Sequence, residues 1–318
     1  LYVDALSGDD DIVLREPAPN DAEWDVDVTI AGGPPSSVTG DQGDVFQMET
    51  PGQQTITYTP TGSDQGTIDD TANNSLITLT NSFTIGALSY TSSTGGVEQF
   101  VYDGEGGDDV VTVVGTGVAD TFVHTPGATI DAGRIAVNNW LALDYQNLGA
   151  VAALTVDGDD GTDELVVRGT DQDDTFDVAG TTGTVGLSNA SGARIPLLQT
   201  GVEGLTLEGL DGDDTFNVSG AHPYTAVAVD GGDPSASDVL FLTGADTAES
   251  VLIAPDSANP TEQLITGLGG DISASGVELI TYTGLSGDDW LYVVPGFGNH
   301  ALRVDSGPVD SVDRVVSD

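Results

Sequence analysis

The sequence predicts an all-β fold, and three observations carry this prediction. Short segments of alternating apolar and polar residues, rich in Val, Thr, Phe and Leu, recur along the 318 residues and end at Gly. The 3.6-residue periodicity of an amphipathic helix is missing, because Gly, Asp and Thr interrupt every candidate window. Similar turn phrases return at long intervals, as they do in repeat proteins. We therefore expect an array of β-repeats.

The segments between the turns predict the strands in chain order. Strand candidates begin about every 11 to 13 residues in the second half of the chain. Two arrangements fit this spacing: a parallel β-solenoid (β-helix) whose coils stack roughly 4.8 Å apart, or tandem β-sandwich modules. The solenoid is preferred because the phrase Thr-Phe-x-Val recurs with inward residues of similar size, and the sandwich modules are the alternative. The clearest strand candidates are Leu205–Leu207, Thr215–Val218, Ala226–Val229 and Val239–Leu242.

Two phrases set the phase of the repeat. Gly-Val-Glu occurs at 96–98, 201–203 and 276–278, and a Gly-Asp-Asp turn follows about ten residues after each. The glycines of the Gly-Asp-Asp turns lie at 8, 107, 212 and 287, so their spacings are 99, 105 and 75 residues. We predict repeat units at 1–103, 104–208, 209–284 and 285–318. The first begins mid-unit and the fourth is incomplete, which suggests a larger parent array.

A second turn type follows the first at a fixed distance. Asp230 and Asp305 each lie sixteen residues after the last Asp of a Gly-Asp-Asp turn, and a further Asp follows each of them, at Asp238 and Asp313. A third phrase, Ala-Asp-Thr, recurs at 119–121 and 245–247. Looser copies of the second turn are Val156–Gly158 with Asp163, and Gly32–Gly33 with Asp41 or Asp44.

The charge of the chain is strongly one-sided. Its 52 acidic residues, 41 of them Asp, stand against six Arg and no Lys, which gives a formal net charge of −46. Nucleic-acid binding needs clustered Lys and Arg to neutralise phosphates, so we expect no nucleic-acid partner. The preference for Asp over Glu favours turns and compact oxygen cages around hard cations. General solubility or adaptation to salt is the alternative explanation of the charge.

Disulfides and membrane spans are not expected. The chain has no Cys, so neither disulfides nor thiolate metal sites contribute. No stretch approaches 18 consecutive apolar residues, so nothing is predicted to span a bilayer. The sequence opens on Leu1 without a charged n-region or an apolar h-region, and we expect any signal peptide to lie outside it, in a longer precursor.

The Gly-Asp-Asp turns resemble the hemolysin-type calcium-binding repeats of RTX proteins, whose nonapeptide reads G-G-x-G-x-D-x-U-x. The second glycine of that motif is missing here, and the copies are isolated instead of tandem, so other turns would have to complete any ion site. The chain is also similar to the long Gly-Val-Glu…Gly-Asp-Asp-Thr-Phe arrays of large bacterial surface proteins. The best copy of the nonapeptide is Gly209, Gly212, Asp214 and Phe216, and others begin at Gly104, Gly158, Gly284, Ala5 and Gly169.

These resemblances imply several Ca²⁺ ions as cofactors and an extracellular or cell-surface location. They also imply a non-enzymatic structural role in a filament, sheath, surface layer or biofilm matrix. Self-association is expected, because a solenoid exposes strand edges at both ends unless these are capped. The alternative function is a carbohydrate-binding adhesin of sandwich modules, with a surface polysaccharide as its partner.

The chemistry of the turns supports a calcium role independently of the family. Glycine permits the positive φ that lets turn carbonyls converge, and adjacent Asp residues supply some of the six to eight oxygen ligands that Ca²⁺ takes. Asp and Gly are also simply good turn formers, which is the alternative explanation. The predicted metal ligands are Asp9, Asp10, Asp103, Asp108, Asp109, Asp157, Asp163, Asp174, Asp211, Asp213, Asp214, Asp230, Asp233, Asp238, Asp288, Asp289, Asp305 and Asp313.

No catalytic site is expected. His124, His222 and His300 lie in or just after turns with no shared spacing, so a structural role is predicted for them. Paired carboxylates are too frequent to identify a glycosidase, and six scattered Arg would leave an acidic polysaccharide facing a repelling surface. Packing is also preferred over sugar stacking for the three tryptophans, which lie in different parts of different repeats. These are Trp24, Trp140 and Trp290.

Overall fold

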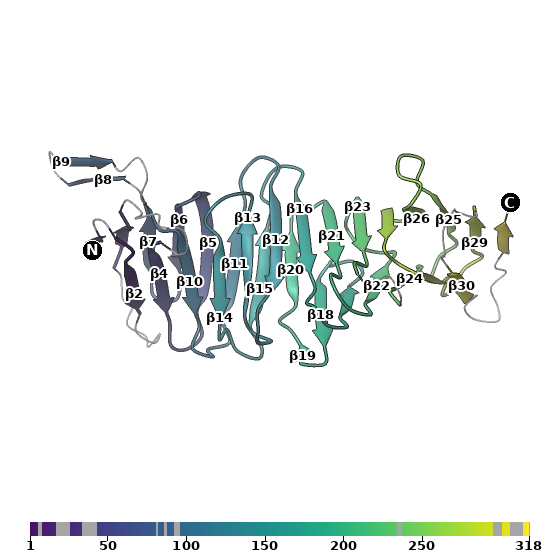
Figure 1. Cartoon of the computed structure of the whole chain (residues 1–318), viewed down its shortest axis with the longest axis horizontal. Coiled ribbons are helices and arrows are strands. Elements are labelled where there is room, and N and C mark those ends of the chain that lie inside the picture. The colour runs from purple at the N-terminus through teal and green to yellow at the C-terminus, as the bar shows by residue number, and fades with distance from the viewer. Residues whose placement is uncertain are drawn as a thin grey trace. The chain divides into compact units, whose positions relative to one another are not determined.

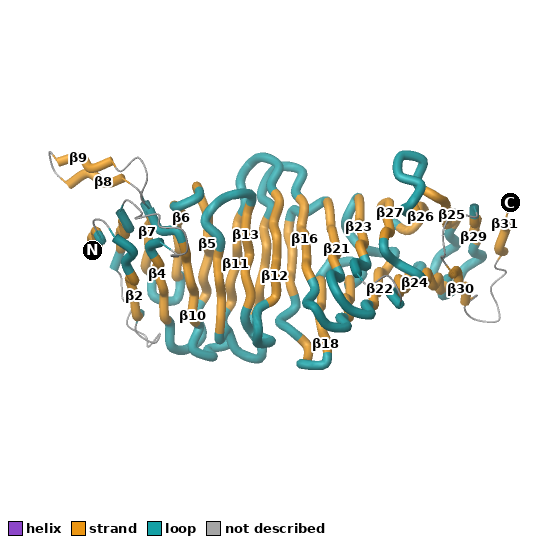
Figure 2. The backbone as a smooth tube through the Cα atoms, in the orientation of Figure 1, coloured by secondary structure: helices purple, strands orange, loops and turns teal. Residues whose placement is uncertain are grey.

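The structure of the chain is a computed structural model. It describes residues 1–5, 8–16, 26–33, 43–80, 82–85, 88–91, 96–233, 237–294, 301–305 and 314–317. This part of the chain consists of strands, turns and loops without a helix, which confirms the all-β prediction (Figures 1 and 2). No long apolar helix that could cross a membrane occurs among these residues. Four residues with predicted roles lie outside the described part, Trp24, Asp41, His300 and Asp313, as does the side chain of Asp305.

The chain divides into two compact units, Leu1–Gly161 and Thr162–Asp318, called unit 1 and unit 2 below. The strands of unit 1 are β1 (Tyr2–Asp4), β2 (Asp11–Arg15), β3 (Val28–Ala31), β4 (Val45–Glu49), β5 (Thr55–Gly62), β6 (Gln65–Asp70), β7 (Ser75–Leu79), β8 (Ser82–Ile85), β9 (Leu88–Thr91), β10 (Gln99–Asp103), β11 (Val110–Val114), β12 (Thr121–Pro126), β13 (Gly133–Val137), β14 (Leu143–Gln146) and β15 (Ala153–Asp157). The strands of unit 2 are β16 (Glu164–Arg168), β17 (Thr175–Val178), β18 (Val185–Asn189), β19 (Gly192–Ala193), β20 (Leu197–Thr200), β21 (Gly204–Glu208), β22 (Thr215–Ser219), β23 (Ala226–Asp230), β24 (Val239–Thr243), β25 (Ser250–Pro255), β26 (Gln263–Leu268), β27 (Gly270–Ser275), β28 (Leu279–Thr283), β29 (Trp290–Val293), β30 (Ala301–Asp305) and β31 (Arg314–Ser317).

Each unit contributes strands to two mixed sheets. In unit 1 the orders are β1-β3-β7-β6-β5-β11-β15 and β2-β4-β10-β14-β13-β12, and β8 and β9 form a separate hairpin. In unit 2 the orders are β20-β18-β17-β22-β24-β28-β30, with β19 on β18, and β16-β21-β23-β27-β26-β25-β29-β31. Consecutive turns of the chain therefore visit the two sheets in alternation, as with β21, β22, β23 and β24.

Parallel in-register pairs dominate, and antiparallel hairpins interrupt them. In unit 2, β17, β22, β24, β28 and β30 pair in parallel one after another. The hairpin strands β25, β26 and β27 instead pair antiparallel. The segments predicted as strands after residues 205, 215, 226 and 239 form β21 to β24. The sheets are thus mixed and open, whereas a strictly parallel coil would contain no hairpins.

The core of each unit lies between its two sheets. Inward and outward side chains alternate along the strands, so that Phe216 and Val218 of β22 are buried while their neighbours are partly exposed. Phe216 stacks on Phe176 of β17, the residue paired with it in the sheet, at 4.9 Å between ring centroids. The recurring Thr-Phe-x-Val phrase therefore places like residues on top of one another. Burying each such ring stabilises the fold by about 1.5 to 3 kcal/mol.

Candidate functional site

The predicted metal ligands fall into two groups that differ in burial. Six are buried and directly precede a strand: Asp109, Asp163, Asp174, Asp214, Asp238 and Asp289. Six are exposed, on turns or at a strand end: Asp9, Asp211, Asp213, Asp230, Asp233 and Asp288. The others whose side chains are described, Asp10, Asp103, Asp108 and Asp157, are half-buried.

The buried acids of unit 2 bond each strand start to the next. The backbone N–H of Asp174 donates to Oδ1 of Asp214 at 2.8 Å, and that of Asp214 donates to Oδ1 of Asp238 at 2.7 Å. The N–H of Asp238 in turn donates to Oε2 of Glu278 at 2.9 Å. These four residues, the carboxyl column, stand before the adjacent parallel strands β17, β22, β24 and β28. Each carboxyl thus satisfies a buried backbone N–H at the corner before a strand.

The same bond recurs at other strand starts in both units. Its donors are the backbone N–H groups of residues that directly precede a strand, and its acceptors are the acids before the next strand of the same sheet. In unit 1 the pairs are Asp10 with Asp44, Asp44 with Glu98, and Gln54 with Asp109. In unit 2 the further pairs are Asp163 with Glu203 and Glu249 with Asp289.

These bonds explain the Gly-Val-Glu phrase. Its Glu is the acceptor in three of the pairs, at Glu98, Glu203 and Glu278, and its Val is buried in the core each time. The backbone continues the link, since the N–H of Glu203 donates to the carbonyl oxygen of Asp163 at 3.0 Å. Gly-Val-Glu therefore forms the corner whose Glu carboxyl group accepts the backbone N–H from the preceding strand start.

At five buried acids, the glycine five residues before the acid leaves room for the carboxyl group. A Cβ on Gly209 would overlap both Oδ2 of Asp214 and the carbonyl oxygen of Gly231. The glycines at 104, 115, 169 and 284 face the acids at 109, 120, 174 and 289 in the same way. The later glycine has the conformational role that the sequence predicts, since Gly212 has a φ of +142°. The first glycine of the phrase is therefore required by the lack of space for a Cβ, and the later one by its backbone conformation.

Burial makes the carboxyl column unusual electrostatically. Burial raises the pKa of Asp214 to about 7, against the opposing hydrogen bond from Asp174 and with further upward contributions from the Asp238 and Asp174 charges. Burial likewise raises the pKa of Asp238 and of Asp44. No donor among the described residues reaches the buried Oδ2 atom of any of these three. A proton on that oxygen would remove the charge and could be donated to a neighbouring carbonyl.

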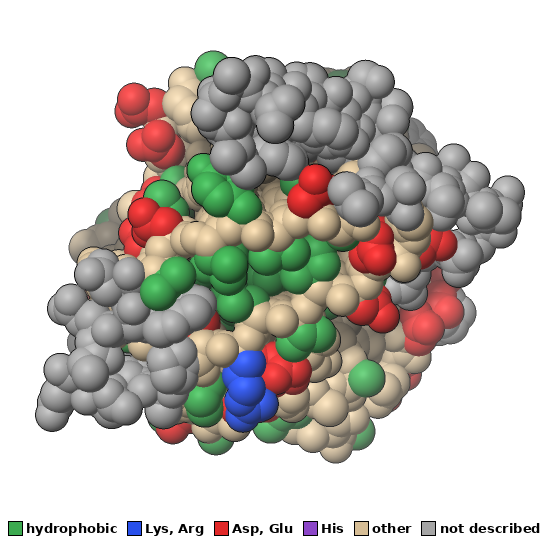
Figure 3. Space-filling view, turned by 90° about the vertical axis from the view of Figure 1, so that its left-hand side faces the viewer, with side chains coloured by type: hydrophobic (Ala, Val, Ile, Leu, Met, Phe, Trp, Pro, Cys, Tyr) green, Lys and Arg blue, Asp and Glu red, His purple; other side chains and the backbone are tan. Residues whose placement is uncertain are grey.

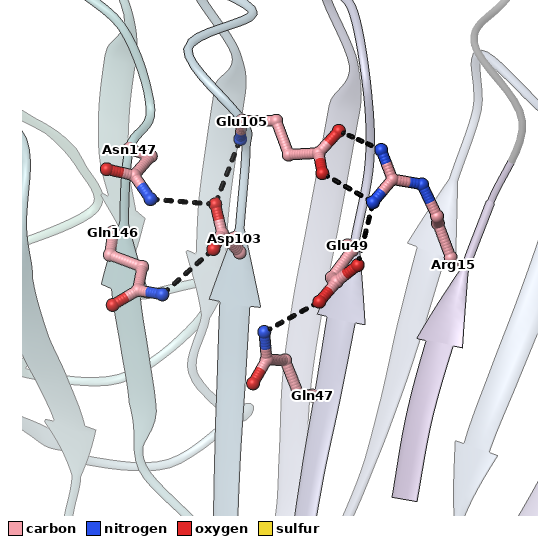
Figure 4. Close-up of polar contacts among 7 residues, drawn as sticks. All are labelled: Arg15, Gln47, Glu49, Asp103, Glu105, Gln146 and Asn147. Carbon is pink, nitrogen blue, oxygen red and sulfur yellow. Dashed lines mark hydrogen bonds and ion pairs between the residues drawn. The ribbon is translucent and has the colours of Figure 1, made fainter.

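Several half-buried or exposed acids are held by cross-strand hydrogen bonds. Asp103, at the end of β10, accepts from the backbone N–H of Glu105 and from the side-chain amides of Gln146 and Asn147 at 2.9 to 3.0 Å (Figure 4). Asp108 accepts from the N–H of Val151 at 3.0 Å. In the same region Arg15 contacts Glu49 at 3.0 Å and Glu105 at 2.7 Å (Figure 4). These polar groups tie β2, β4, β10 and β14 together across the surface of unit 1.

Four exposed acids gather at one place in unit 2. Asp171, Asp211, Asp230 and Asp233 line an open hollow of about 550 Å³ with Leu210 and Gly232. Asp211 and Asp233 are neighbours in a parallel bridge, and the N–H of Asp233 donates to the carbonyl oxygen of Leu210 at 2.8 Å. Within the described ranges, no three His or acidic side chains already converge in a geometry suited to a metal ion. A cation in the hollow would therefore need the exposed carboxylates to turn toward it.

The described histidines are packed in the interior. His124 shares a hydrogen bond of 2.8 Å with the hydroxyl of Tyr145 and stacks on its ring. His222 lies 6.0 Å from the ring of Tyr224, and burial lowers its pKa. Both positions suit the structural role that the sequence predicts.

A buried polar cluster in unit 1 has no counterpart in the sequence analysis. Glu16 and Asp70 are buried, and the side-chain amide of Asn73 donates to both, at 3.1 and 3.0 Å. Ser75 donates to the other oxygen of Glu16 at 2.8 Å. Burial and the adjacent Asp70 raise the pKa of Glu16 to about 8. Neither acid belongs to a repeated phrase, so no sequence signal marks them.

Two acids at strand starts that were not among the predicted ligands share a signal. Buried Asp120 and half-buried Glu249 directly precede β12 and β25 and follow a glycine by five residues. Buried Asp44, which belongs to a looser copy of the second turn, precedes β4 without such a glycine. A pattern of glycine, four residues, an acid and then a strand would have found the first two.

The fold and the hydrogen-bonded corners before its strands together define an all-β protein with recurring corners, in which carboxyl groups join one strand start to the next. Comparison of the sequence with protein-family models and with curated proteins finds no match.

Proposed function

We propose that the chain is a non-enzymatic structural segment of an extracellular array, built as a two-sheet β-solenoid with hairpin excursions and stabilised by calcium. The carboxyl column is the observation that carries this proposal. It links one strand start to the next by a repeated bond, so that the phrases most frequent in the sequence serve the stacking of strands. A filament, sheath, surface layer or biofilm matrix is the setting in which such stacking has a direct use.

The parallel register supports a stack that resists deformation along its length. Asp174, Asp214 and Asp238 stand one strand apart; Asp214 is held from both sides by bonds of 2.8 and 2.7 Å, and Asp238 by bonds of 2.7 and 2.9 Å. Sliding one strand against the next would break the backbone ladder and the corner bonds together. Buried carboxyl-to-amide bonds are stronger than neutral ones, because one partner carries charge or becomes strongly polarised.

The acidic hollow of unit 2 is our candidate calcium site. Asp211 belongs to a Gly-Asp-Asp turn that resembles calcium-binding repeats, Asp230 and Asp233 belong to the second turn type, and Asp171 adds a fourth carboxylate. The exposed oxygens suit a hard cation, and open sites of this kind bind Ca²⁺ at the roughly 0.1 to 1 mM dissociation constants of extracellular modules. Ca²⁺ would also relieve the repulsion among the four carboxylates.

Thermal unfolding with calcium and with chelator tests this function. Calcium at about 100 times its dissociation constant should raise the unfolding free energy of the native chain by about 2.7 kcal/mol. The double variant Asp211→Asn and Asp233→Asn should lose most of that rise. Asp271→Asn, which removes an exposed carboxylate on β27, is the matched control and should keep it. An equal melting temperature with calcium and with chelator would refute the calcium role.

One aromatic pair favours the adhesin as a second candidate. Trp290 and Tyr292 stack along β29 with ring centroids 5.9 Å apart and planes 18° from parallel, and Tyr292 is exposed. A flat pair of this kind suits the apolar face of a sugar. Binding of neutral oligosaccharides, followed by tryptophan fluorescence, tests it: the adhesin predicts a signal that Tyr292→Ala abolishes, and the structural array predicts none.

A further inference from the structure

An uncharged belt crosses the outward face of one sheet in unit 2. Residues that pair in register lie on the same face of a sheet, and so do residues two apart on one strand. By these rules the belt is continuous over β23, β27, β26, β25 and β29. Its members are Ala228, Ser273, Leu264 and Ala254 in one row, and Leu252 and Tyr292 in the next.

The lack of charge along the belt indicates what kind of partner it suits. Acidic side chains are common elsewhere on the surface, and Figure 3 shows them spread over the end of unit 1 that carries β2. None of the six belt residues is charged, in a chain whose formal net charge is −46. Covering a carboxylate without pairing it costs free energy, so a belt without carboxylates suits an uncharged partner.

A hollow of about 190 Å³ lies at the β23 end of the belt. Gly204 and Ala226 pair with each other in the middle of the hollow, and the exposed acids Glu164 and Asp271 pair with them on either side. The hydroxyl group of Thr206 donates to Oε1 of Glu164 at 2.8 Å, which orients this carboxylate at the rim. The hollow therefore offers acceptors to a neutral molecule that carries hydroxyl groups.

Gly204 keeps the hollow open although the fold does not require a glycine there. Glycine weakens the interior of a strand, because it has no side chain to pack. A Cβ on Gly204 would meet its nearest atoms at 3.6 and 3.7 Å, which is ordinary contact, whereas a Cβ on Gly209 would overlap its neighbours. Gly204 also has no positive φ. A strand glycine of this kind often marks a place where a ligand approaches the backbone.

We propose that the hollow and the belt together bind a straight, uncharged polysaccharide, with Trp290 and Tyr292 at the far end of the site. This inference rests on the second candidate function above and extends its site from one aromatic pair to a line across the sheet. A β-linked glucan fits, because its flat ring faces suit Tyr292 and the apolar belt while its hydroxyl groups reach Glu164 and Asp271. An acidic polysaccharide would be repelled by these two carboxylates.

The length of the site gives the first test. Four strand gaps of about 4.8 Å separate β23 from β29, which is roughly 19 Å and more than a disaccharide spans. Calorimetric titration of the full chain should therefore show cellohexaose binding at least about tenfold more tightly than cellobiose, since only the longer sugar engages both ends at once. This comparison needs no variant.

Gly204→Val gives the second test, because its side chain fills the hollow while a β-branched residue suits the strand. It should fold at least as stably as wild type and lower the affinity for cellohexaose about tenfold, to that for cellobiose. Gly186→Val is the matched control and should bind as wild type does. Gly186 lies outward on β18 of the other sheet in unit 2, and its Cβ would also meet no atom closer than 3.6 Å.

Three results would overturn the proposal. Equal affinities of wild type for the two sugars would leave Trp290 and Tyr292 as an isolated site, so the second candidate function would survive without the extended one. Unchanged cellohexaose binding by folded Gly204→Val would exclude the hollow. Polygalacturonate binding more tightly than cellohexaose would contradict the preference for an uncharged chain. If neither glucan binds, the second candidate function itself fails, and this inference fails with it.

Discussion

Replacing Asp214 with Asn should stabilise unit 2 at neutral and mildly alkaline pH, and by less at pH 5. The side chain of Asp214 is buried, Oδ1 accepts the N–H of Asp174, and no described donor reaches Oδ2. Asn keeps the acceptor oxygen and replaces Oδ2 by a neutral N–H group, so that no anion has to be buried. The substitution therefore supplies permanently what a proton supplies only in acid.

The size of the effect follows from the pKa of the carboxyl group. Burial raises it from 3.8 to about 7, so the folded chain holds a proton that the unfolded chain has released between these two values. The unfolding free energy then falls as pH rises through this window, because the folded state binds more protons. The full shift corresponds to about 4 kcal/mol. We take this as an upper bound, since burial also raises the pKa of the neighbouring Asp238, and a proton there would relieve Asp214.

Urea unfolding followed by far-ultraviolet circular dichroism measures the effect. Midpoints should be compared between about pH 5 and about pH 8.5, well above the sequence pI of 4.1 at which the chain would precipitate, and in chelator so that calcium does not contribute. At full shift the variant should already be more stable than wild type by about 1.6 kcal/mol at pH 5, because the unfolded carboxyl group is largely ionised there. The difference should grow with pH to at most about 4 kcal/mol and level off above pH 7.

Asp213→Asn is the control for this experiment. It removes one negative charge from the adjacent position, where the side chain is exposed, so it should shift stability by no more than about 0.5 kcal/mol at any pH. Two results would refute the reasoning. One is a variant less stable than wild type at pH 8, which means that Asp214 is a favourable buried anion. The other is an identical pH dependence for both proteins.

Two further predictions concern the glycine beside a buried acid and the polar cluster of unit 1. Gly209→Ala should lower the unfolding free energy by about 3 kcal/mol, because its Cβ would meet backbone as well as a carboxyl oxygen. Gly117→Ala is the control: no atom lies within 4 Å of its added Cβ, so it should change the unfolding free energy by less than about 1 kcal/mol in the same urea titration. Wild-type unit 1 should lose stability as pH rises toward 8, because the pKa of Glu16 is raised to about 8. Glu16→Gln should make the melting temperature of unit 1 less dependent on pH over this range. An unchanged dependence on pH would show that Glu16 is ionised throughout.

Strand positions were the part of the fold that the sequence could predict. The pattern of alternation depends on local burial, so β21 to β24 begin within one residue of the predicted segments. The hairpin strands β25 to β27 were harder, because nothing local says whether the next strand pairs with its sequence neighbour or with a strand 40 residues away. Partner choice depends on the whole sheet.

The positions of the corner acids could be predicted from the sequence, but their backbone contacts could not. Sequence alone picks out Asp214 and Asp238, since they recur at glycine corners, and predicts them as metal ligands. In the structure both are buried, and each accepts a backbone N–H from the preceding strand start of its sheet. Whether a turn Asp points outward or into the sheet end depends on that preceding strand, which provides the donor. That information is not local.

Because some of the acids are buried, the formal net charge overstates the negative charge on the surface. Ten acidic side chains of the described part are buried, among them Asp109 and Asp214, whose pKa values are raised to about 7. The surface that faces solvent or a second copy is therefore less negative than the formal −46. Three of the acids that accept a strand-start N–H, Asp109, Asp214 and Asp289, have a glycine five residues before them and a strand directly after them. At these corners acidity, glycine content and strand pattern are linked, which a chain acidified only for solubility would have no reason to do.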